Sequence, residues 1–178
     1  MSMGIFAPIF SCLLIVVESM LPILPLCVFI TINFYYFGSL LGFIISYIFT
    51  CIGSFISYTL VKKGIKILAI ESAEKTGFLN KAIKIIKKVE LPMLVTIIAI
   101  PFTPAFMVNI AAGLAKLDTK KYLISLLIGK IFMVYFWGFV GVSLIESLKN
   151  PYILIKVAIM VLIAYLIAII TKKFIKES

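Results

Sequence analysis

The sequence contains no histidine and no arginine, so all 17 of its basic residues are lysines. Without histidine the chain lacks the commonest metal ligand and general base of proteins. Its three cysteines, Cys12, Cys27 and Cys51, lie apart inside apolar segments and form no CxxC or Cys/His pattern. There is also no acid pair and no Ser/Lys constellation that would support nucleophilic chemistry. We therefore expect a protein that is not an enzyme, holds no metal and needs no cofactor.

The formal net charge of +10 does not indicate nucleic-acid binding. Arginine forks and a soluble basic face, the usual elements of a nucleic-acid interface, are both missing. Lysines that flank apolar runs set membrane topology and meet anionic lipid headgroups. We expect membrane lipids rather than nucleic acid as partners, and the sequence leaves a homo-oligomer possible.

Apolar residues are abundant instead. Hydrophobic residues make up 63% of the 178 positions, and the mean hydropathy is +1.24. Several apolar runs exceed the ~20 residues that a spanning helix needs. These values predict an all-α, polytopic integral membrane protein whose residues 1–178 form a single membrane domain, closed by a transmembrane helix at 152–171.

An apolar run at Leu91–Leu117 is interrupted near its middle by Pro101 and Pro104. Each proline removes a backbone donor and clashes with the preceding turn of a helix. Broken backbone survives at membrane depth only where protein or a water-filled cavity satisfies its polar groups. The pattern predicts a re-entrant hairpin, with Asn109 and Gly113 in its second arm.

The lysines support re-entry independently. If Leu91–Leu117 returns to the side it entered, 14 of the 17 lysines gather on one face of the membrane, with Lys149 and Lys156 opposite and Lys130 within a span. By the positive-inside rule that face is cytoplasmic. We expect a multi-pass protein of a cell membrane, with the bacterial plasma membrane as the first choice.

The first half shows a similar arrangement. Pro22 and Pro25 break an apolar run, Asn33 follows, and a long helix is predicted over Phe37–Val61. The first break is approached from the outer side and the second from the lysine-rich side. We expect inverted-topology repeats at 4–61 and 91–145, whose broken segments meet near the midplane. Residues 4–21 are either a full span or a hairpin arm, which leaves the side of the N-terminus open.

The segment between the repeats, residues 62–90, is the one sizeable polar stretch. Leu79, Ile83 and Ile86 recur in it at helical spacing with lysines between them. Two alternatives fit: a cytoplasmic amphipathic helix with its apolar side in the headgroup layer, or a helix that covers the domain.

With these motifs the chain resembles the DedA superfamily, also called the VTT-domain or SNARE-associated Golgi protein family, and in particular bacterial proteins related to a yeast late-Golgi vesicle protein. The residues that carry the resemblance are Glu18, Pro22, Pro25, Asn33, Gly38, Gly42, Gly53, Tyr58 and Lys62 in the first half and Pro101, Pro104, Asn109, Ala112, Gly113, Leu114, Tyr122, Gly129 and Lys130 in the second. The resemblance implies paired re-entrant loops and the transport or scrambling of lipids, including polyprenyl-phosphate carriers.

The chain departs from its relatives at two places. Many relatives carry an arginine just before the second Pro-x-x-Pro, where this chain has Ile98. Many also carry a second acid after the first Pro-x-x-Pro, where this chain has Leu26, Cys27 and Val28.

Four polar residues are candidates for binding substrate or ions: Glu18, Asn33, Asn109 and Lys130. Glu18 either binds a proton, balances a cation or snorkels to the interface. Lys130 either contacts an anionic headgroup, pairs with Glu18 or snorkels. Asn109 either satisfies carbonyls freed by the broken backbone or binds substrate.

Five further residues are expected to shape the re-entrant loops: Pro22, Pro25, Pro101, Pro104 and Gly113. The helix ends at such tips present free N–H groups, which suit an anion. The sequence thus predicts a transporter-like protein that moves an anionic lipid, a phospholipid or a polyprenyl phosphate, between leaflets through a midplane cavity. The alternative is a membrane scaffold or assembly factor without transport activity.

Overall fold

The computed structural model describes residues 6–19, 26–65, 78–147 and 152–177, and these residues form helices and connecting turns without a strand. The helices are α1 (Phe6–Glu18), α2 (Leu26–Lys62), α4 (Phe78–Lys88), α5 (Leu91–Ala99), α6 (Ala105–Leu114), α7 (Thr119–Ser147) and α8 (Ile153–Glu177). The predicted all-α class is confirmed. Pro22 and Pro25 lie outside the described residues.

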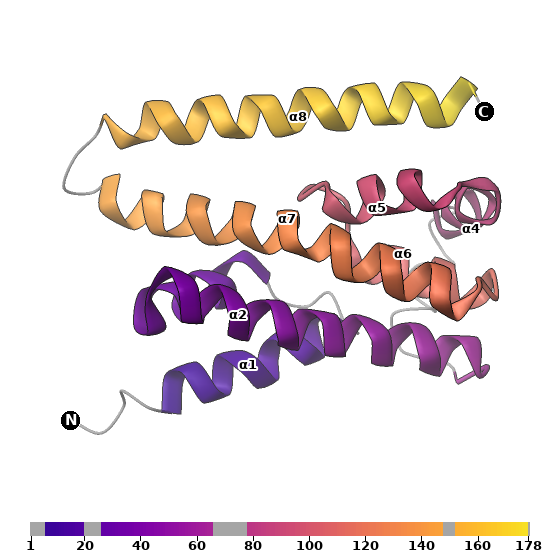
Figure 1. Ribbon diagram of the computed structural model, residues 1–178, viewed down its shortest axis with the longest axis horizontal. Coiled ribbons are helices and arrows are strands. Elements are labelled where there is room, and N and C mark those ends of the chain that lie inside the picture. The colour runs from indigo at the N-terminus through magenta and orange to yellow at the C-terminus, as the bar shows by residue number, and fades with distance from the viewer. Residues whose placement is uncertain (1–5, 20–25, 66–77, 148–151, 178) are drawn as a thin grey trace.

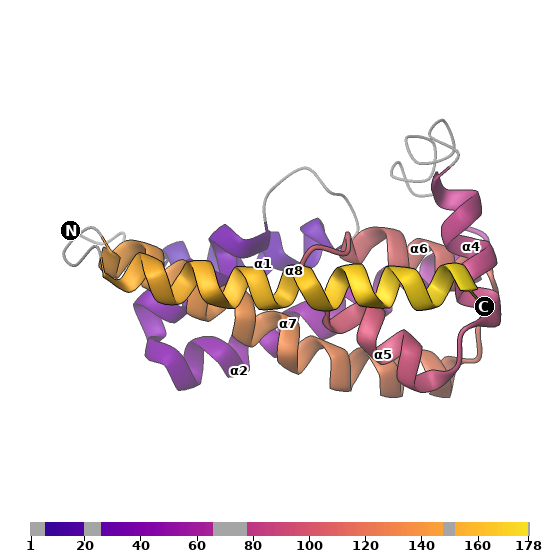
Figure 2. The ribbon, with the colours of Figure 1, turned by 90° about the horizontal axis from the view of Figure 1, so that it is seen from above.

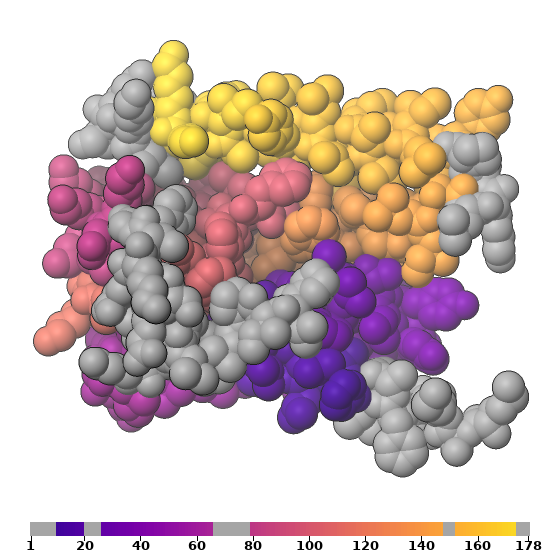
Figure 3. All heavy atoms as spheres, turned by 180° about the vertical axis from the view of Figure 1, so that it is seen from behind, coloured from indigo at the N-terminus to yellow at the C-terminus, as the bar shows by residue number. Residues whose placement is uncertain are grey.

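The long helices run side by side along the longest axis of the molecule (Figure 1). α7 lies between α8 on one side and α2 on the other, and α1 packs beyond α2. Among the described residues, three helices are long and apolar enough to cross a membrane: Leu26–Lys62, Thr119–Ser147 and Ile153–Lys173. α8 forms an outer layer in the space-filling view, and most of its side chains are exposed (Figure 3).

α2 is not one continuous helix. Gly38 interrupts it with φ 76° and ψ 173°. Residues other than glycine rarely adopt this backbone conformation, because their Cβ would clash with the backbone. The chain turns at this residue, so that the arm before Gly38 packs back against the helix after it. A Cβ on Gly42 would lie 2.6 Å from Phe34 Cα and 2.7 Å from the Asn33 carbonyl oxygen. The predicted helix over Phe37–Val61 therefore corresponds to the part of α2 after this turn.

α5 and α6 form a helical hairpin. With 9 and 10 residues they are each about 15 Å long, half the thickness of a hydrocarbon core of ~30 Å. Both ends of the hairpin lie at one end of the bundle, where Lys121 Nζ donates to the Val89 carbonyl at 2.6 Å and Lys62 Nζ donates to the Leu117 carbonyl at 2.7 Å. The proline break is therefore a turn between two antiparallel arms, and its depth in a bilayer stays a prediction.

Glycines let the two hairpins pack closely on the long helices. A Cβ on Gly53 of α2 would meet Val16 Cα of α1 at 2.9 Å, and a Cβ on Gly129 of α7 would meet Ile98 of α5 at 2.8 Å. Gly113 of α6 packs in the same way on α2, 2.9 Å from the Tyr58 carbonyl oxygen. Small residues at helix interfaces are the usual means of close approach in membranes.

The amphipathic segment ends in α4, which lies across the end of the bundle and is seen nearly end-on in Figure 1. Leu79 and Ile86 are each 2% exposed and pack in the hydrophobic cluster around α6. Part of the apolar side of this helix therefore packs on the protein, which is the contact that the second alternative from the sequence requires.

The lysine-rich segments meet at the same end of the bundle as α4. The C-termini of α2 and α8 and the start of α7 all lie there (Figures 1 and 2). α7 begins after Asp118, whose Oδ2 accepts the N–H of Lys121 at 2.9 Å, and this hydrogen bond lowers the pKa of the Asp118 carboxyl. The grouping of lysines agrees with the count from the sequence, whereas the side of the membrane stays a prediction.

The turn at Gly38 generates a prediction on stability. Replacing Gly42 by alanine is expected to destabilise the protein by about 1–3 kcal/mol, because its Cβ would meet backbone atoms that cannot move aside. Unfolding in mild detergent can be followed by the reaction of the buried thiols of Cys12 and Cys51 with a thiol-reactive dye. Ser39→Ala, an exposed change in the same helix, is the control. Equal stability of the two variants would contradict the close packing.

Candidate functional site

Two buried asparagines organise the interior, one in each half of the chain. Asn33 is 0% exposed, and its Nδ2 donates to Ser46 Oγ at 3.1 Å and lies 3.9 Å from Cys12 Sγ. Its Oδ1 accepts a hydrogen bond from the Ser11 hydroxyl. Asn33 therefore ties α1 to both parts of α2.

Asn109 joins the second hairpin to the first. Its Nδ2 donates to the carbonyl oxygen of Ser19, directly after α1, at 3.2 Å. Its Oδ1 accepts from the hydroxyl of Tyr122 on α7 at 2.8 Å. Of the two alternatives drawn from the sequence, the structure shows the first: Asn109 satisfies a carbonyl freed at the end of a broken helix.

The two amides have corresponding partners. Asn33 bonds to Ser46, and Asn109 bonds to Tyr122, so each partner lies 13 residues after its asparagine. The separation between Asn33 and Asn109 is the same 76 residues that separates Gly53 from Gly129. The contacts thus follow a common register in the two halves.

Lys130 lies in the middle of α7, about 16 Å along the helix from Thr119 and about 26 Å from Ser147. It is 1% exposed, and its Nζ has no hydrogen-bond partner among the described residues. An ammonium group in a low-dielectric interior is costly unless it is paired or coordinated. Snorkelling is therefore excluded for this residue, and its charge calls for a partner.

Glu18 is a candidate for that partner. It ends α1, and its charge interacts electrostatically with that of Lys130. Its Oε2 is buried without a hydrogen-bond partner in the part of the chain that the structure describes, as are the hydroxyls of Ser54 and Ser57 on α2. The two opposite charges thus face the same interior without a direct hydrogen bond between them.

A small cavity of about 10 Å³ adjoins Lys130. It is lined by Ile97, Ile98, Thr103, Ala105, Val108, Asn109 and Lys130. α6 begins at Ala105, and the first N–H groups of a helix have no acceptor within the helix and carry a partial positive charge. The cavity therefore combines an unpaired ammonium with a positive helix end, which is the chemistry of an anion site.

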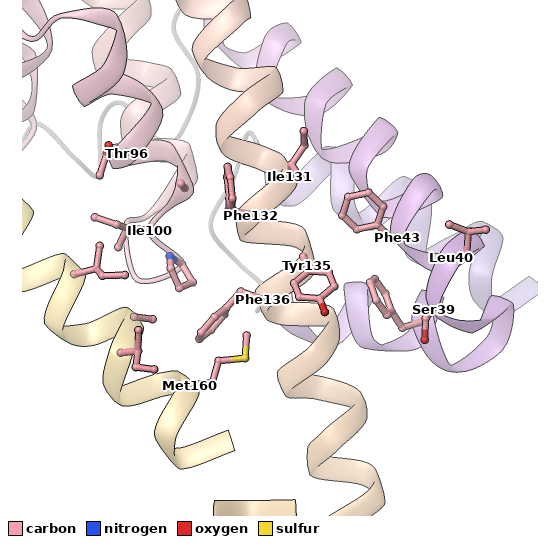
Figure 4. A pocket seen from close by; sticks show the side chains of 16 residues that line it. Ser39, Leu40, Phe43, Thr96, Ile100, Ile131, Phe132, Tyr135, Phe136 and Met160 are labelled. Carbon is pink, nitrogen blue, oxygen red and sulfur yellow. The ribbon is translucent and has the colours of Figure 1, made fainter. Parts of the chain in front are cut away.

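A second, larger space lies on the other side of the hairpin tip. This groove of about 820 Å³ runs between α2, α5, α7 and α8 (Figure 4). Ile100 and Pro101 of the tip form one wall, and Phe132, Tyr135 and Phe136 of α7 form another. Its lining is almost entirely apolar, in contrast to the cavity at Lys130.

The structure brings three of the four predicted site residues together. Asn109 and Lys130 line one cavity, and Glu18 interacts electrostatically with Lys130, whereas Asn33 makes its hydrogen bonds within the first half. Pro101 and Pro104 form the tip, and Gly113 serves the contact with α2 rather than the tip itself.

Sequence reasoning named Tyr122 among the residues that carry the family resemblance but gave it no role at the site. Tyr122 is fully buried, stacks on Tyr58 with ring centroids 4.0 Å apart, and positions Asn109. The common spacing of Asn33 to Ser46 and Asn109 to Tyr122 was the signal that could have identified it.

These features define a helical integral membrane protein with a buried, charged interior between two broken segments. The chain matches the VTT domain over residues 21–143 and belongs to the VTT-domain family, the DedA superfamily that its motifs resemble. This family consists of membrane proteins that are commonly of the transporter type.

A relative in Bacillus subtilis (strain 168) is the uncharacterized membrane protein YhjE. It is 27% identical over 168 residues, which cover 94% of this chain and 80% of the relative. No solved structure matches the chain.

The contact between the hairpins generates a second prediction. Asn109→Ala is expected to cost about 1–3 kcal/mol, because it removes the amide donor of the Ser19 carbonyl and leaves the Tyr122 hydroxyl with only its longer hydrogen bond, to the Ser54 carbonyl at 3.2 Å. Combined with Tyr122→Phe, the two changes should be less than additive, with a coupling energy of about 0.5–2 kcal/mol. The measurement is a double-mutant cycle on unfolding in detergent, with Tyr135→Phe in place of Tyr122→Phe as the control. Full additivity for both pairs would contradict this hydrogen bond.

Proposed function

We propose that this protein translocates or scrambles an anionic lipid, a phospholipid or a polyprenyl phosphate, between the leaflets of a membrane. The observation that carries the proposal is the unpaired ammonium of Lys130 beside the N-terminus of α6. An ionisable residue inside a membrane is expensive and is usually retained for function. A phosphate group would supply the hydrogen-bond acceptors that the Lys130 ammonium lacks among the described residues.

The departure at Ile98 fits the same proposal. Ile98 occupies the place where many relatives carry an arginine, and it lines the cavity that Lys130 enters from α7. Lys130 thus provides a cation at this position from a different helix. Lysine is a compact point charge, and it binds phosphate without the fork geometry of arginine.

Glu18 balances the charge of Lys130 when no anion is bound. Because the two groups interact without a hydrogen bond at Lys130 Nζ, an incoming anion would compete with a weak partner and not with a tight ion pair. A tight buried pair would hold both groups in place and oppose exchange.

The arrangement of the two halves is what an inverted repeat would give, and such a repeat supports the transport class. The hairpins enter the bundle from opposite ends (Figure 1), and the 76-residue register relates their asparagines. In transporters built this way the broken segments meet around the substrate, and the two halves exchange conformations. Here the contact between Asn109 and the Ser19 carbonyl lies next to the Glu18–Lys130 pair.

The second candidate function is a scaffold without transport activity, favoured by the many hydrogen bonds that fix the hairpins. The two functions differ in what Lys130 does. In a scaffold its charge only destabilises the fold, whereas in a transporter it binds the substrate.

Lys130→Met is therefore expected to lower the transfer of fluorescent phosphatidylglycerol between vesicle leaflets by about tenfold or more, while Lys130→Arg retains part of it. The same Met variant should unfold no more easily than the original protein, because it removes a buried ammonium that makes no hydrogen bond to the described residues. Transfer is measured with purified protein in vesicles, by quenching the probe that remains in the outer leaflet.

Lys156→Met removes a lysine from an exposed position of α8 and is the matched control. Unchanged transfer in Lys130→Met would remove this residue from the mechanism. Loss of both transfer and stability, restored in the double variant Lys130→Met with Glu18→Gln, would assign Lys130 to a structural pair instead. No transfer by the original protein would favour the scaffold.

Glu18→Gln is expected to tighten the binding of an anionic lipid several-fold, because it removes the charge that offsets Lys130. The measurement is a fluorescence titration of the detergent-solubilised protein with phosphatidylglycerol, compared with zwitterionic phosphatidylcholine. Glu146→Gln, at an exposed position, is the control. Weaker binding of phosphatidylglycerol to the Glu18 variant would show that the carboxyl group itself contacts the ligand.

A further inference from the structure

The groove between α2, α5, α7 and α8 has the properties of a site for hydrocarbon. Apart from Ser39, Thr96 and Tyr135, its lining side chains carry no polar group, and three of its walls are helices with apolar faces. Phe43 and Leu40 approach it from α2, Phe132 and Phe136 from α7, and Met160 from α8 (Figure 4). Its volume of about 820 Å³ falls in the range of ligand pockets, ~300–1,000 Å³.

The groove also lies at the depth of the buried charge. Its residues on α7, Ile131 to Phe136, directly follow Lys130 along the helix and bracket the middle of Thr119–Ser147. At this depth a spanning helix is surrounded by acyl chains and not by headgroups. An occupant of the groove is therefore apolar along most of its length.

The hairpin tip separates the groove from the cavity at Lys130. Ile100 and Pro101 face the groove, whereas Thr103 and Ala105 face Lys130. The turn is narrow: it is held by one backbone hydrogen bond, from the Thr103 N–H to the Ile100 carbonyl at 3.1 Å. A single short turn thus stands between an apolar site and a cationic site.

The cavity at Lys130 is closed in this conformation. Its volume of about 10 Å³ is at the lower limit of the ~10–15 Å³ that a single water needs, so a phosphate group does not fit. The groove, in contrast, is open. A ligand with a chain and an anionic head would find a place for the chain first and reach Lys130 only when the tip moves.

We infer that this groove binds the hydrocarbon chain of an anionic bilayer lipid, and that the Ile100–Pro104 tip must move aside for the headgroup to reach Lys130. The charge of Lys130 behind the tip favours an anionic lipid over a second copy of the chain as the occupant. The assignment of the headgroup to Lys130 rests on the proposed function, whereas the assignment of the chain to the groove rests on its lining.

The test uses the full-length protein in phosphatidylcholine vesicles that contain phosphatidylglycerol with a photoactivatable diazirine in its acyl chain. After illumination, mass spectrometry maps the labelled residues. Labelling should concentrate on Phe132, Met160 and Ile163 in the groove, several-fold above Leu162 and Leu166, which are exposed on α8 outside it.

Ala164→Trp fills the groove from α8 and is expected to reduce this labelling by about tenfold. Ala158→Trp places the same side chain at an exposed position of α8 outside the groove and should leave the labelling unchanged. A diazirine-labelled phosphatidylcholine should label the groove less than the anionic probe, and Lys130→Met should remove this difference.

Uniform labelling around α8, or cross-links between copies of the groove, would overturn the inference. So would a preference for the anionic probe that survives Lys130→Met, because the groove and the lysine would then be independent. Specific labelling without any lipid transfer would support the groove site and contradict the proposed function. Transfer with uniform labelling would contradict the groove and leave the proposed function standing.

Discussion

The backbone groups that the two broken helices leave free must find hydrogen-bond partners inside the protein, because lipid offers none. Asn109 meets this requirement for the first hairpin by donating to the Ser19 carbonyl, and Tyr122 fixes the orientation of Asn109. This contact brings the end of α1 against α6 and thereby places Glu18 near Lys130. The hydrogen bond from Asn109 thus connects the second hairpin to the end of α1 beside this charged interior.

The buried polar groups that lack a hydrogen-bond partner are informative, because most buried polar groups of a native protein have one. The asparagines, Tyr122 and Tyr58 all make hydrogen bonds, whereas the hydroxyls of Ser54 and Ser57 and the ammonium of Lys130 have no partner among the described residues. Of these groups without a partner, the buried cation carries the largest cost in stability. Such a cost is typical of a binding site, where the missing partner is the ligand.

The groove suits the hydrocarbon chain of an amphiphile, and the cavity suits its anionic headgroup. One is large, open and apolar, and the other is small, closed and cationic, with the Ile100–Pro104 turn between them. The prolines explain why this turn can separate two sites: Pro104 precedes the first residue of α6 and starts the new helix, while Pro101 ends the ladder of α5. The same residues that break the helix thus form the partition.

The sequence alone determined the helical class, the membrane setting and the family, because hydropathy and the spacing of motifs can be read directly along the chain. It also predicted the break at Pro101 and Pro104 and identified Glu18, Asn109 and Lys130 as isolated polar groups in apolar segments. It could not decide between the alternatives for each residue. Tertiary packing decided four features. Asn109 bonds to a carbonyl 90 residues away, and Lys130 is buried without a hydrogen bond to the described residues. α4 packs on the hydrophobic cluster around α6, and Tyr122 belongs to the core. Each of these features depends on which helices pack against each other. Helix contacts made through small residues, such as Gly53, Gly113 and Gly129, leave no pattern in the sequence from which the partner helix can be identified.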